Sequence, residues 1–202
     1  TLYNHAYSFK YPKAGDKNSV VELYLYDIAS QSRTKIDVGN NTDQYIFNVA
    51  WTPANKLYFY RVNRLQNNFE VVMCNEDGTQ KVIYTESSPR YVERPNSSTI
   101  TFIDRDKFIV MEETSAGWMH LYLHSVAKGR LNAITSGCWE VVSFVGHDGK
   151  NIYYTSTESS PLERNLYSVR LNGKSRRLLT PEGGFNTIIP SAGMKYYVRT
   201  FN

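Results

Sequence analysis

Long apolar runs and cysteines are scarce in this 202-residue sequence. Apolar stretches such as Val141-Val142 and Phe144-Val145 are short and interrupted, and no run approaches the roughly 20 mostly apolar residues that a membrane-spanning helix needs. Two cysteines, Cys74 and Cys138, cannot build a disulfide framework. A single bridge between them stays open, but we expect both to be free, buried or half-buried apolar residues. Cysteine usage therefore does not fix the cellular compartment.

Concentrated charge of one sign is also missing. The chain has 23 Lys and Arg against 19 Asp and Glu, and its densest basic run, Lys174-Ser175-Arg176-Arg177, lies beside a predicted turn. A nucleic-acid-binding protein gathers its basic residues on one face, so we expect no nucleic-acid partner. The 16 Tyr, 9 Phe and 3 Trp residues carry too much apolar surface for a disordered chain.

Catalytic and cofactor motifs are absent. Gly173-Lys174-Ser175 is the only Gly-x-Ser, and because Arg176 and Arg177 follow it, no Gly-x-Ser-x-Gly nucleophile elbow exists. There is no Gly-x-Gly-x-x-Gly, no phosphate-binding loop and no Cys-x-x-Cys. We therefore predict no catalytic residue and no cofactor. The chain starts at Thr1 without a signal-peptide pattern, and we expect it to be a piece of a longer protein.

An internal repeat is the most informative feature that is present. One series of short strand-like segments has its first apolar residue at Leu23, Val71, Leu121 and Leu166, with separations of 48, 50 and 45 residues. A second series is marked by Tyr58, Ile109, Tyr153 and Tyr197, with separations of 51, 44 and 44 residues. The segments are rich in Tyr, Val, Ile, Phe and Thr, which favour β-strands, and apolar periodicity typical of long helices is missing.

Repeats of four short antiparallel strands are the signature of β-propeller blades. In the unit 139–180 we predict strands at 139–145, 151–155, 165–171 and 176–180, and the hairpin dipeptides Asp77-Gly78 and Asn172-Gly173 support turns. The predicted fold is an all-β propeller fragment of about three full blades and two half blades of an eight-bladed ring. The predicted units are half blade 22–38, blades 45–86, 99–135 and 139–180, and half blade 185–202.

Two polar patterns resemble a metal site and a carboxylate pair, but both have simpler structural interpretations. His120 and His124 have metal-ligand spacing only on a helix; on a strand their rings are roughly 13 Å apart, so we expect solvent-facing or hydrogen-bonded histidines. Glu112 and Glu113 are adjacent carboxylates, but neighbours on a strand point to opposite faces and do not converge on one atom. We predict no metal site.

Three tryptophans, Trp51, Trp118 and Trp139, recur at matching places in the repeat. They could form a ligand platform, but we expect them to pack between blades, since large aromatic rings dominate such interfaces.

Several motifs taken together resemble the propeller domain of the dipeptidyl peptidase IV family. They are, in chain order, Tyr11-Pro12-Lys13-Ala14-Gly15, Trp51 with Leu57 to Val62 and Gln66-Asn67, Glu112 to Tyr122, Thr135 to Val141 with its Thr-x-Gly-x-Trp-Glu-Val pattern, and Arg164 to Tyr167. The matches cover nearly the whole chain. The resemblance implies the later half of an eight-bladed propeller that caps an α/β-hydrolase domain and filters substrates by size.

Members of that family are serine exopeptidases that release X-Pro or X-Ala dipeptides from free N-termini. By this resemblance, the triad and the amine-clamping Glu pair lie outside this chain, and the clamp role does not pass to Glu112-Glu113. A propeller arginine near the family's substrate pocket precedes a proline, which makes Arg94, before Pro95, the one candidate substrate-binding residue. The implied partners are a peptide substrate, the hydrolase domain and the remaining blades, and the implied location is outside the cytoplasm: periplasmic, secreted or on the cell surface.

Two further hypotheses stay open. A stand-alone ligand-binding or protein-binding propeller is the alternative function, with Tyr91, Trp118 and Phe185 as its loop aromatics. The half blades 22–38 and 185–202 are expected to expose unpaired edges, so a homodimer that exchanges these halves is a second hypothesis.

Overall fold

The computed structural model describes residues 3–93 and 95–202, and these residues are almost entirely β-structure. Within this described part the one helix is a 3-10 turn, η1 (Ala192–Met194), and no helix is long and apolar enough to cross a membrane. The strands are β1 (Leu23–Asp27), β2 (Ser32–Ile36), β3 (Gln44–Trp51), β4 (Leu57–Asn63), β5 (Asn68–Cys74), β6 (Gln80–Ser87), β7 (Ile100–Phe102), β8 (Lys107–Glu113), β9 (Met119–Ser125), β10 (Gly129–Ala133), β11 (Val141–His147), β12 (Asn151–Ser156), β13 (Asn165–Arg170), β14 (Arg177–Leu178), β15 (Asn186–Pro190) and β16 (Tyr197–Phe201).

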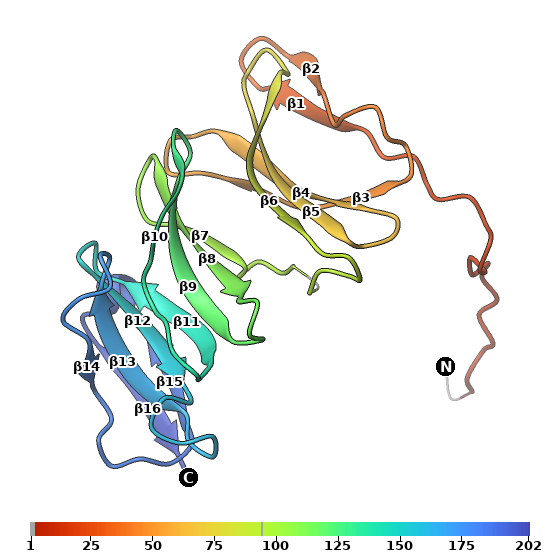
Figure 1. Cartoon of the computed structure of the whole chain (residues 1–202). Helices are drawn as coiled ribbons and strands as arrows, with labels where there is room; N and C mark the ends of the chain where they lie inside the picture. Colours follow the sequence, from red (N-terminus) through yellow and green to blue (C-terminus); the bar gives the residue numbers. More distant parts are fainter. Residues whose placement is uncertain (1–2, 94) are drawn as a thin grey trace.

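The strands form three four-stranded sheets between two hairpins. The full sheets have the orders β3-β4-β5-β6, β7-β8-β9-β10 and β11-β12-β13-β14, and the hairpins are β1-β2 and β15-β16. Every neighbouring pair of strands is antiparallel, and the sheets follow one another along an arc (Figure 1). The fold prediction, a β-propeller fragment with three full blades and two half blades, is confirmed.

The core lies between successive sheets. Phe69 and Tyr60 of the β3-β6 sheet are fully buried in one cluster with Phe108 of the β7-β10 sheet. Within the β3-β6 sheet, the rings of Tyr60 and Phe69 meet edge to face with their centroids 5.0 Å apart. Burial of one such side chain stabilises the fold by about 1.5–3 kcal/mol. A second cluster, centred on Ile109, Leu121 and Tyr154, joins the β7-β10 and β11-β14 sheets. A sheet buried on both faces explains why these strands read as continuous apolar runs.

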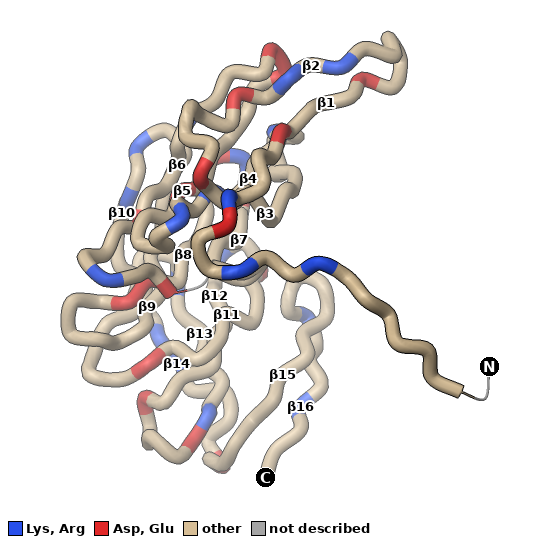
Figure 2. Tube along the Cα trace, turned by 90° about the vertical axis from the view of Figure 1, so that its right-hand side faces the viewer, with Lys and Arg blue, Asp and Glu red and all other residues tan. Residues whose placement is uncertain are grey.

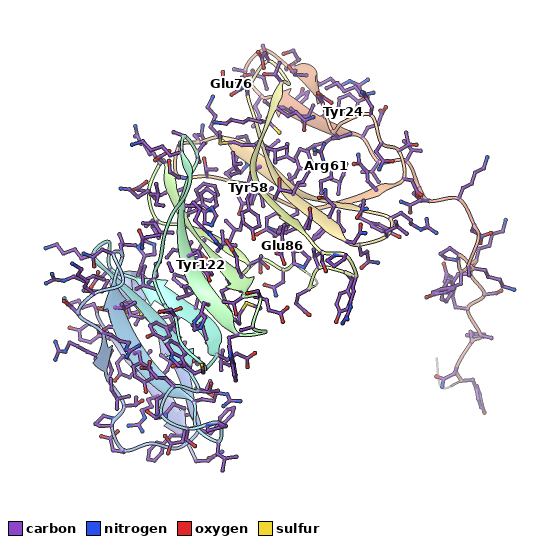
Figure 3. All side chains as sticks on the ribbon, viewed as in Figure 1. Tyr24, Tyr58, Arg61, Glu76, Glu86 and Tyr122 are labelled. Carbon is purple, nitrogen blue, oxygen red and sulfur yellow. The ribbon has the colours of Figure 1, made fainter. Side chains whose placement is uncertain are left out.

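The β1-β2 hairpin packs on the outer side of the β3-β6 sheet. Ile36 of β2 is fully buried with Phe59 and Val72, and Leu23 and Leu25 of β1 pack against that cluster. A polar contact supports the same interface. Arg61 of β4 (labelled in Figure 3) pairs with Glu70 at 2.6 Å and donates from Nη1 to the Val38 carbonyl at 2.8 Å.

The outer strand β14 is shorter than its predicted span, 176–180. At the end of β14 a threonine hydroxyl takes the place of a backbone carbonyl as hydrogen-bond acceptor. The Leu166 backbone N–H of β13 donates to Thr180 Oγ1 at 2.9 Å. The preceding sheet repeats the device 45 residues earlier, where the Leu121 N–H donates to Thr135 Oγ1 at 2.9 Å. In both sheets the hydroxyl ends the outer strand while keeping the buried N–H paired.

The two cysteines are free, and they differ in exposure. Cys74 is buried in the core cluster beneath the β1-β2 hairpin, as expected. Cys138 is exposed, so the expectation of a buried or half-buried residue is wrong there. Its neighbour Gly137 has a φ of +146°, and the Gly137 carbonyl turns inward to accept a hydrogen bond from His120 Nε2 at 3.0 Å. Residue 138 therefore lies in an irregular segment between sheets rather than in a strand.

Candidate functional site

The antiparallel order brings one set of loops to the same end of every sheet. First and third strands begin at this end, and second and fourth strands finish there. The tight Asp-Gly and Asn-Gly turns lie at the opposite end. Figure 3 shows the contrast on one sheet, with Glu76 at one end of β6 and Glu86 toward the other.

A cavity of about 310 Å³ opens among these loops. It lies where β6 and β8 end and where β9 and β11 begin. Its lining is Glu86, Glu93, Asn96, Ser98, Thr99, Met111, Glu113, Met119, Val142, Ser143 and Phe144. Three carboxylates and no cation are among these residues, so the described part of the lining is acidic. We take this cavity as the candidate functional site.

The environment of Glu86 perturbs its carboxyl group. Burial raises its pKa above the ordinary value of 4.5, and the negative charge of nearby Glu112 raises the pKa further. The hydroxyl of Tyr84 donates to Glu86 Oε2 at 3.4 Å and opposes the rise. A half-buried carboxyl surrounded by like charges favours the protonated form, which can donate as well as accept a hydrogen bond.

Glu112 and Glu113 diverge, as strand geometry predicted. The Glu112 carboxylate accepts from His124 Nε2 at 2.8 Å and also pairs with Arg130. Glu113 lines the cavity instead, beside Met119. The two carboxylates therefore do not act as one clamp, and only Glu113 belongs to the candidate site.

The prediction for Arg94 falls outside the described residues. Its neighbours are described: Glu93 lines the cavity, and Pro95 is buried and lines a second, larger cavity of about 580 Å³. That second cavity lies beside β3, where residues 18–21 cross it, and Gln44, Phe47 and Val92 are among its other lining residues. A substrate-binding role for Arg94 stays a prediction.

His120 and His124 are hydrogen-bonded but not solvent-facing. Both rings are buried; His120 Nδ1 lies 3.0 Å from Thr135 Oγ1, and His124 contacts Glu112. Within residues 3–93 and 95–202, no group of three or more His, Cys, Asp or Glu side chains is placed to hold a metal ion.

The three tryptophans have different roles. Trp139 packs between sheets as expected, with its ring edge-on to His120 at 4.8 Å and stacked on Tyr154 at 6.2 Å. Trp118 is half-buried in the β8-β9 loop. Trp51 is 55% exposed, so the expected packing is wrong there. It lies at the end of β3, beyond the bulge between Phe47 and Ala50 that shifts the register of this strand.

The loop aromatics of the alternative hypothesis share the end of the sheets that carries the acidic cavity. Tyr91 and Phe185 are exposed, and Trp118 is half-buried. None of the three lines the cavity. Sequence reasoning missed Glu86 and Glu93 as site residues, because neither belongs to a motif and only the stacking of sheets brings them beside Glu113.

Figure 2 shows basic and acidic residues interspersed along the trace of the described residues. The acidic cavity is a local feature formed by residues from three sheets.

Comparisons with known proteins agree with the geometry. The family described as dipeptidyl peptidase IV (DPP IV) N-terminal region matches residues 1–202. The probable dipeptidyl peptidase 4 of Arthroderma benhamiae is 29% identical over 98% of this chain and 27% of its own length. The probable dipeptidyl peptidase 4 of Aspergillus flavus is 30% identical over 95% of this chain and 27% of its own length.

Two solved structures share the fold. Porphyromonas gingivalis dipeptidyl peptidase 4 is 32% identical with a TM-score of 0.88, over 97% of this chain and 28% of that protein. A putative dipeptidyl aminopeptidase IV from Bacteroides ovatus is 26% identical with a TM-score of 0.78, over 95% of this chain and 30% of that protein. The chain thus spans less than a third of these relatives. Since the family match extends over all 202 residues, the chain belongs to the dipeptidyl peptidase IV N-terminal region family.

Proposed function

We propose that this chain is the non-catalytic propeller part of a serine dipeptidyl peptidase that releases X-Pro or X-Ala dipeptides from peptide N-termini. The observation that carries the proposal is the whole-chain similarity to Porphyromonas gingivalis dipeptidyl peptidase 4, with a TM-score of 0.88. The sequence itself contains no Gly-x-Ser-x-Gly elbow, which supports a role without the nucleophile.

In this role the stacked sheets form part of the wall around the substrate cavity and limit access to it. Rigid sheets buried on both faces suit a wall, because their shape does not yield to a bulky substrate. The acidic cavity lined by Glu86, Glu93 and Glu113 lies among the loops at one end of that wall. By the same family resemblance, we propose a location outside the cytoplasm.

A chimera tests the proposal. Residues 1–202 replace the matching segment of the Porphyromonas gingivalis enzyme, and hydrolysis of a Gly-Pro chromogenic substrate is measured. The chimera is expected to hydrolyse it, whereas the 202-residue chain alone is expected to show no turnover. Turnover by the chain alone, or a chimera with native circular dichroism but no activity, would overturn the proposal. The second result is what a stand-alone binding propeller predicts.

The proposed control of access to the cavity is tested with two substrates that differ only in size. The same N-terminal Gly-Pro dipeptide is presented on a short peptide and on a tightly folded protein. We expect the active chimera to cleave the short peptide and to spare the folded protein. Equal cleavage of both would contradict the gating role. It would not contradict the proposal that this chain is part of a serine dipeptidyl peptidase.

A further inference from the structure

One connection between successive sheets is longer than the others. Residues 37–43, 134–140 and 179–185 join β2 to β3, β10 to β11 and β14 to β15, and each of these connections has seven residues. The connection from β6 to β7, residues 88–99, has twelve (Figure 1). All four lie at the end of the sheets that carries the acidic cavity. Binding residues are found disproportionately on loops that a rigid scaffold positions, which makes the long connection the one to follow.

The 88–99 connection forms one wall of the acidic cavity. Four residues of the lining come from it: Glu93, Asn96, Ser98 and Thr99. Beside Glu93, Val92 is buried in the core cluster between the β3-β6 and β7-β10 sheets, and Pro95 is buried as well. The connection therefore holds an exposed carboxylate at the cavity between two residues that are fixed by burial.

Two backbone hydrogen bonds tie the connection to the turn between β4 and β5. The Ser88 N–H donates to the Asn67 carbonyl at 3.0 Å, and the Val92 N–H donates to the Gln66 carbonyl at 2.9 Å. Gln66 has a φ of +54°, which is an uncommon backbone conformation for a residue with a side chain. The acceptor of the Val92 N–H thus belongs to a turn that needs support from elsewhere.

Asn63, the last residue of β4, supplies that support. Its Oδ1 accepts from the Asn67 N–H at 3.1 Å and from the Asn68 N–H at 3.0 Å, and its Nδ2 donates to Asn67 Oδ1 at 2.7 Å. Its carbonyl accepts from the Gln66 N–H at 2.9 Å. Asparagine suits this task, because its short side chain reaches backbone groups of the same turn. One side chain therefore holds the turn whose carbonyls hold the 88–99 connection.

We propose that Asn63 is a positioning residue of the candidate site. Through the β4-β5 turn it keeps the 88–99 connection, and Glu93 with it, in the conformation that binds the peptide substrate. Asn63 is not one of the described residues that line the acidic cavity, so it acts through the turn alone. When the turn loosens, only a fraction of the molecules present Glu93 correctly, and the apparent affinity for substrate falls by that fraction. This role rests on the proposed dipeptidyl peptidase function.

Kinetics of the chimera with the Porphyromonas gingivalis enzyme test the proposal. Asn63→Ala is expected to raise KM for the Gly-Pro chromogenic substrate about threefold to tenfold, because it removes the hydrogen bonds that hold the turn. The value of kcat is expected to stay nearly unchanged, since no reacting group is altered. Asn63→Asp keeps an acceptor for both N–H groups and is expected to restore most of the affinity. Asn172→Ala is the matched control, because Asn172 Oδ1 accepts from the Lys174 N–H in a turn at the opposite end of the sheets.

Trypsin cleavage after Arg90 measures the anchoring of the connection without any substrate. Arg90 is exposed and lies between the two anchored residues, Ser88 and Val92. Cleavage of such a segment follows how often it opens, so Asn63→Ala is expected to speed cleavage of this bond about threefold to tenfold. Cleavage after the exposed Lys174 is expected to stay unchanged in the same variant, and mass spectrometry of the fragments distinguishes the two bonds.

A double-mutant cycle tests whether Asn63 acts through Glu93. In a Glu93→Ala background, Asn63→Ala is expected to raise KM much less than it does alone, because the group that it positions is gone. An undiminished effect in that background, an unchanged KM for Asn63→Ala alone, or an equal effect of Asn172→Ala would overturn the proposal.

Failure of the proposed function gives a different result, which is a parent chimera that folds but has no activity. The binding role of Asn63 would then fall with the proposed function, whereas an active parent chimera with an unchanged KM for Asn63→Ala overturns the role of Asn63 alone.

Discussion

His124 of β9 and Glu112 of β8 meet diagonally between neighbouring strands, with Nε2 and Oε1 2.8 Å apart. The residues directly opposite them in the ladder are Phe108 and His120, respectively. The His124 ring also stacks on Phe108 at 5.4 Å and meets Tyr84 edge-on at 5.3 Å. Tyr84 comes from the preceding sheet, so this polar pair lies at the junction of two sheets. A buried polar group that is paired in this way fixes the orientation of its neighbours.

We expect Glu112→Ala to destabilise the chain. The substitution leaves the buried His124 Nε2 without its partner, which costs about 1–3 kcal/mol of unfolding free energy. Glu113→Ala is the matched control, because Glu113 is exposed and is expected to stay within about 0.5 kcal/mol of the parent. Urea unfolding followed by circular dichroism measures both. Equal effects of the two substitutions would show that the His124 contact contributes nothing.

Gly78→Ala is expected to cost more than Gly149→Ala, although both glycines occupy hairpin turns with φ near +86° (+85° and +87°). A side chain in this left-handed conformation costs roughly 1–2 kcal/mol at either position. A Cβ at residue 78 would also overlap the Lys35 carbonyl oxygen of β2, whereas a Cβ at residue 149 meets nothing within 4 Å. The overlap adds about 1–3 kcal/mol, measurable by thermal or urea unfolding. Indistinguishable stabilities would contradict the packing of β2 on this turn.

The stability of the chain is expected to fall as pH rises through the titration of Glu86. Burial raises the pKa of Glu86 in the folded chain above its ordinary value of 4.5, so the folded state holds a proton that the unfolded state has released. This contribution is present below pH 4.5 and is lost as pH rises through the folded pKa.

Glu86→Gln is therefore expected to flatten the decline. Urea unfolding at a series of pH values from 4 to 8 measures it, with Glu76→Gln in the exposed β5-β6 turn as the control. If the parent and the Glu86 variant show parallel pH profiles, the folded environment does not perturb this carboxyl.

The two thiols are expected to react at very different rates. Cys138 is exposed, whereas Cys74 is buried, and burial together with nearby Asp37 raises the pKa of Cys74 to about 11. Because the thiolate is the reactive form, one thiol per chain should be labelled by a maleimide in the native state and two after unfolding. Cys138→Ser should abolish the native labelling. Rapid labelling of two thiols in the native chain would mean that the β1-β2 hairpin does not cover Cys74.

Much of the strand pattern could be read from the sequence, and local errors have local causes. The repeat placed Tyr153 and Tyr197 at equivalent positions, and their register confirms it. Strand β14 was predicted too long, because the Thr180 hydroxyl takes over a ladder hydrogen bond. The prediction that Cys138 is buried or half-buried is wrong, because an inward turn at Gly137 has no signature in a pattern of apolar residues.

The sequence by itself determined the all-β class, the spacing of the blades and the divergence of Glu112 from Glu113, because strand alternation and turn chemistry act over only a few residues. Only the tertiary structure decided which side chains meet. Glu86, Glu93 and Glu113 line one cavity, and Tyr84 reaches His124, since sheets that stack around an arc bring together residues tens of positions apart. No local pattern records such contacts, because the packing between two sheets depends on both of their faces at once.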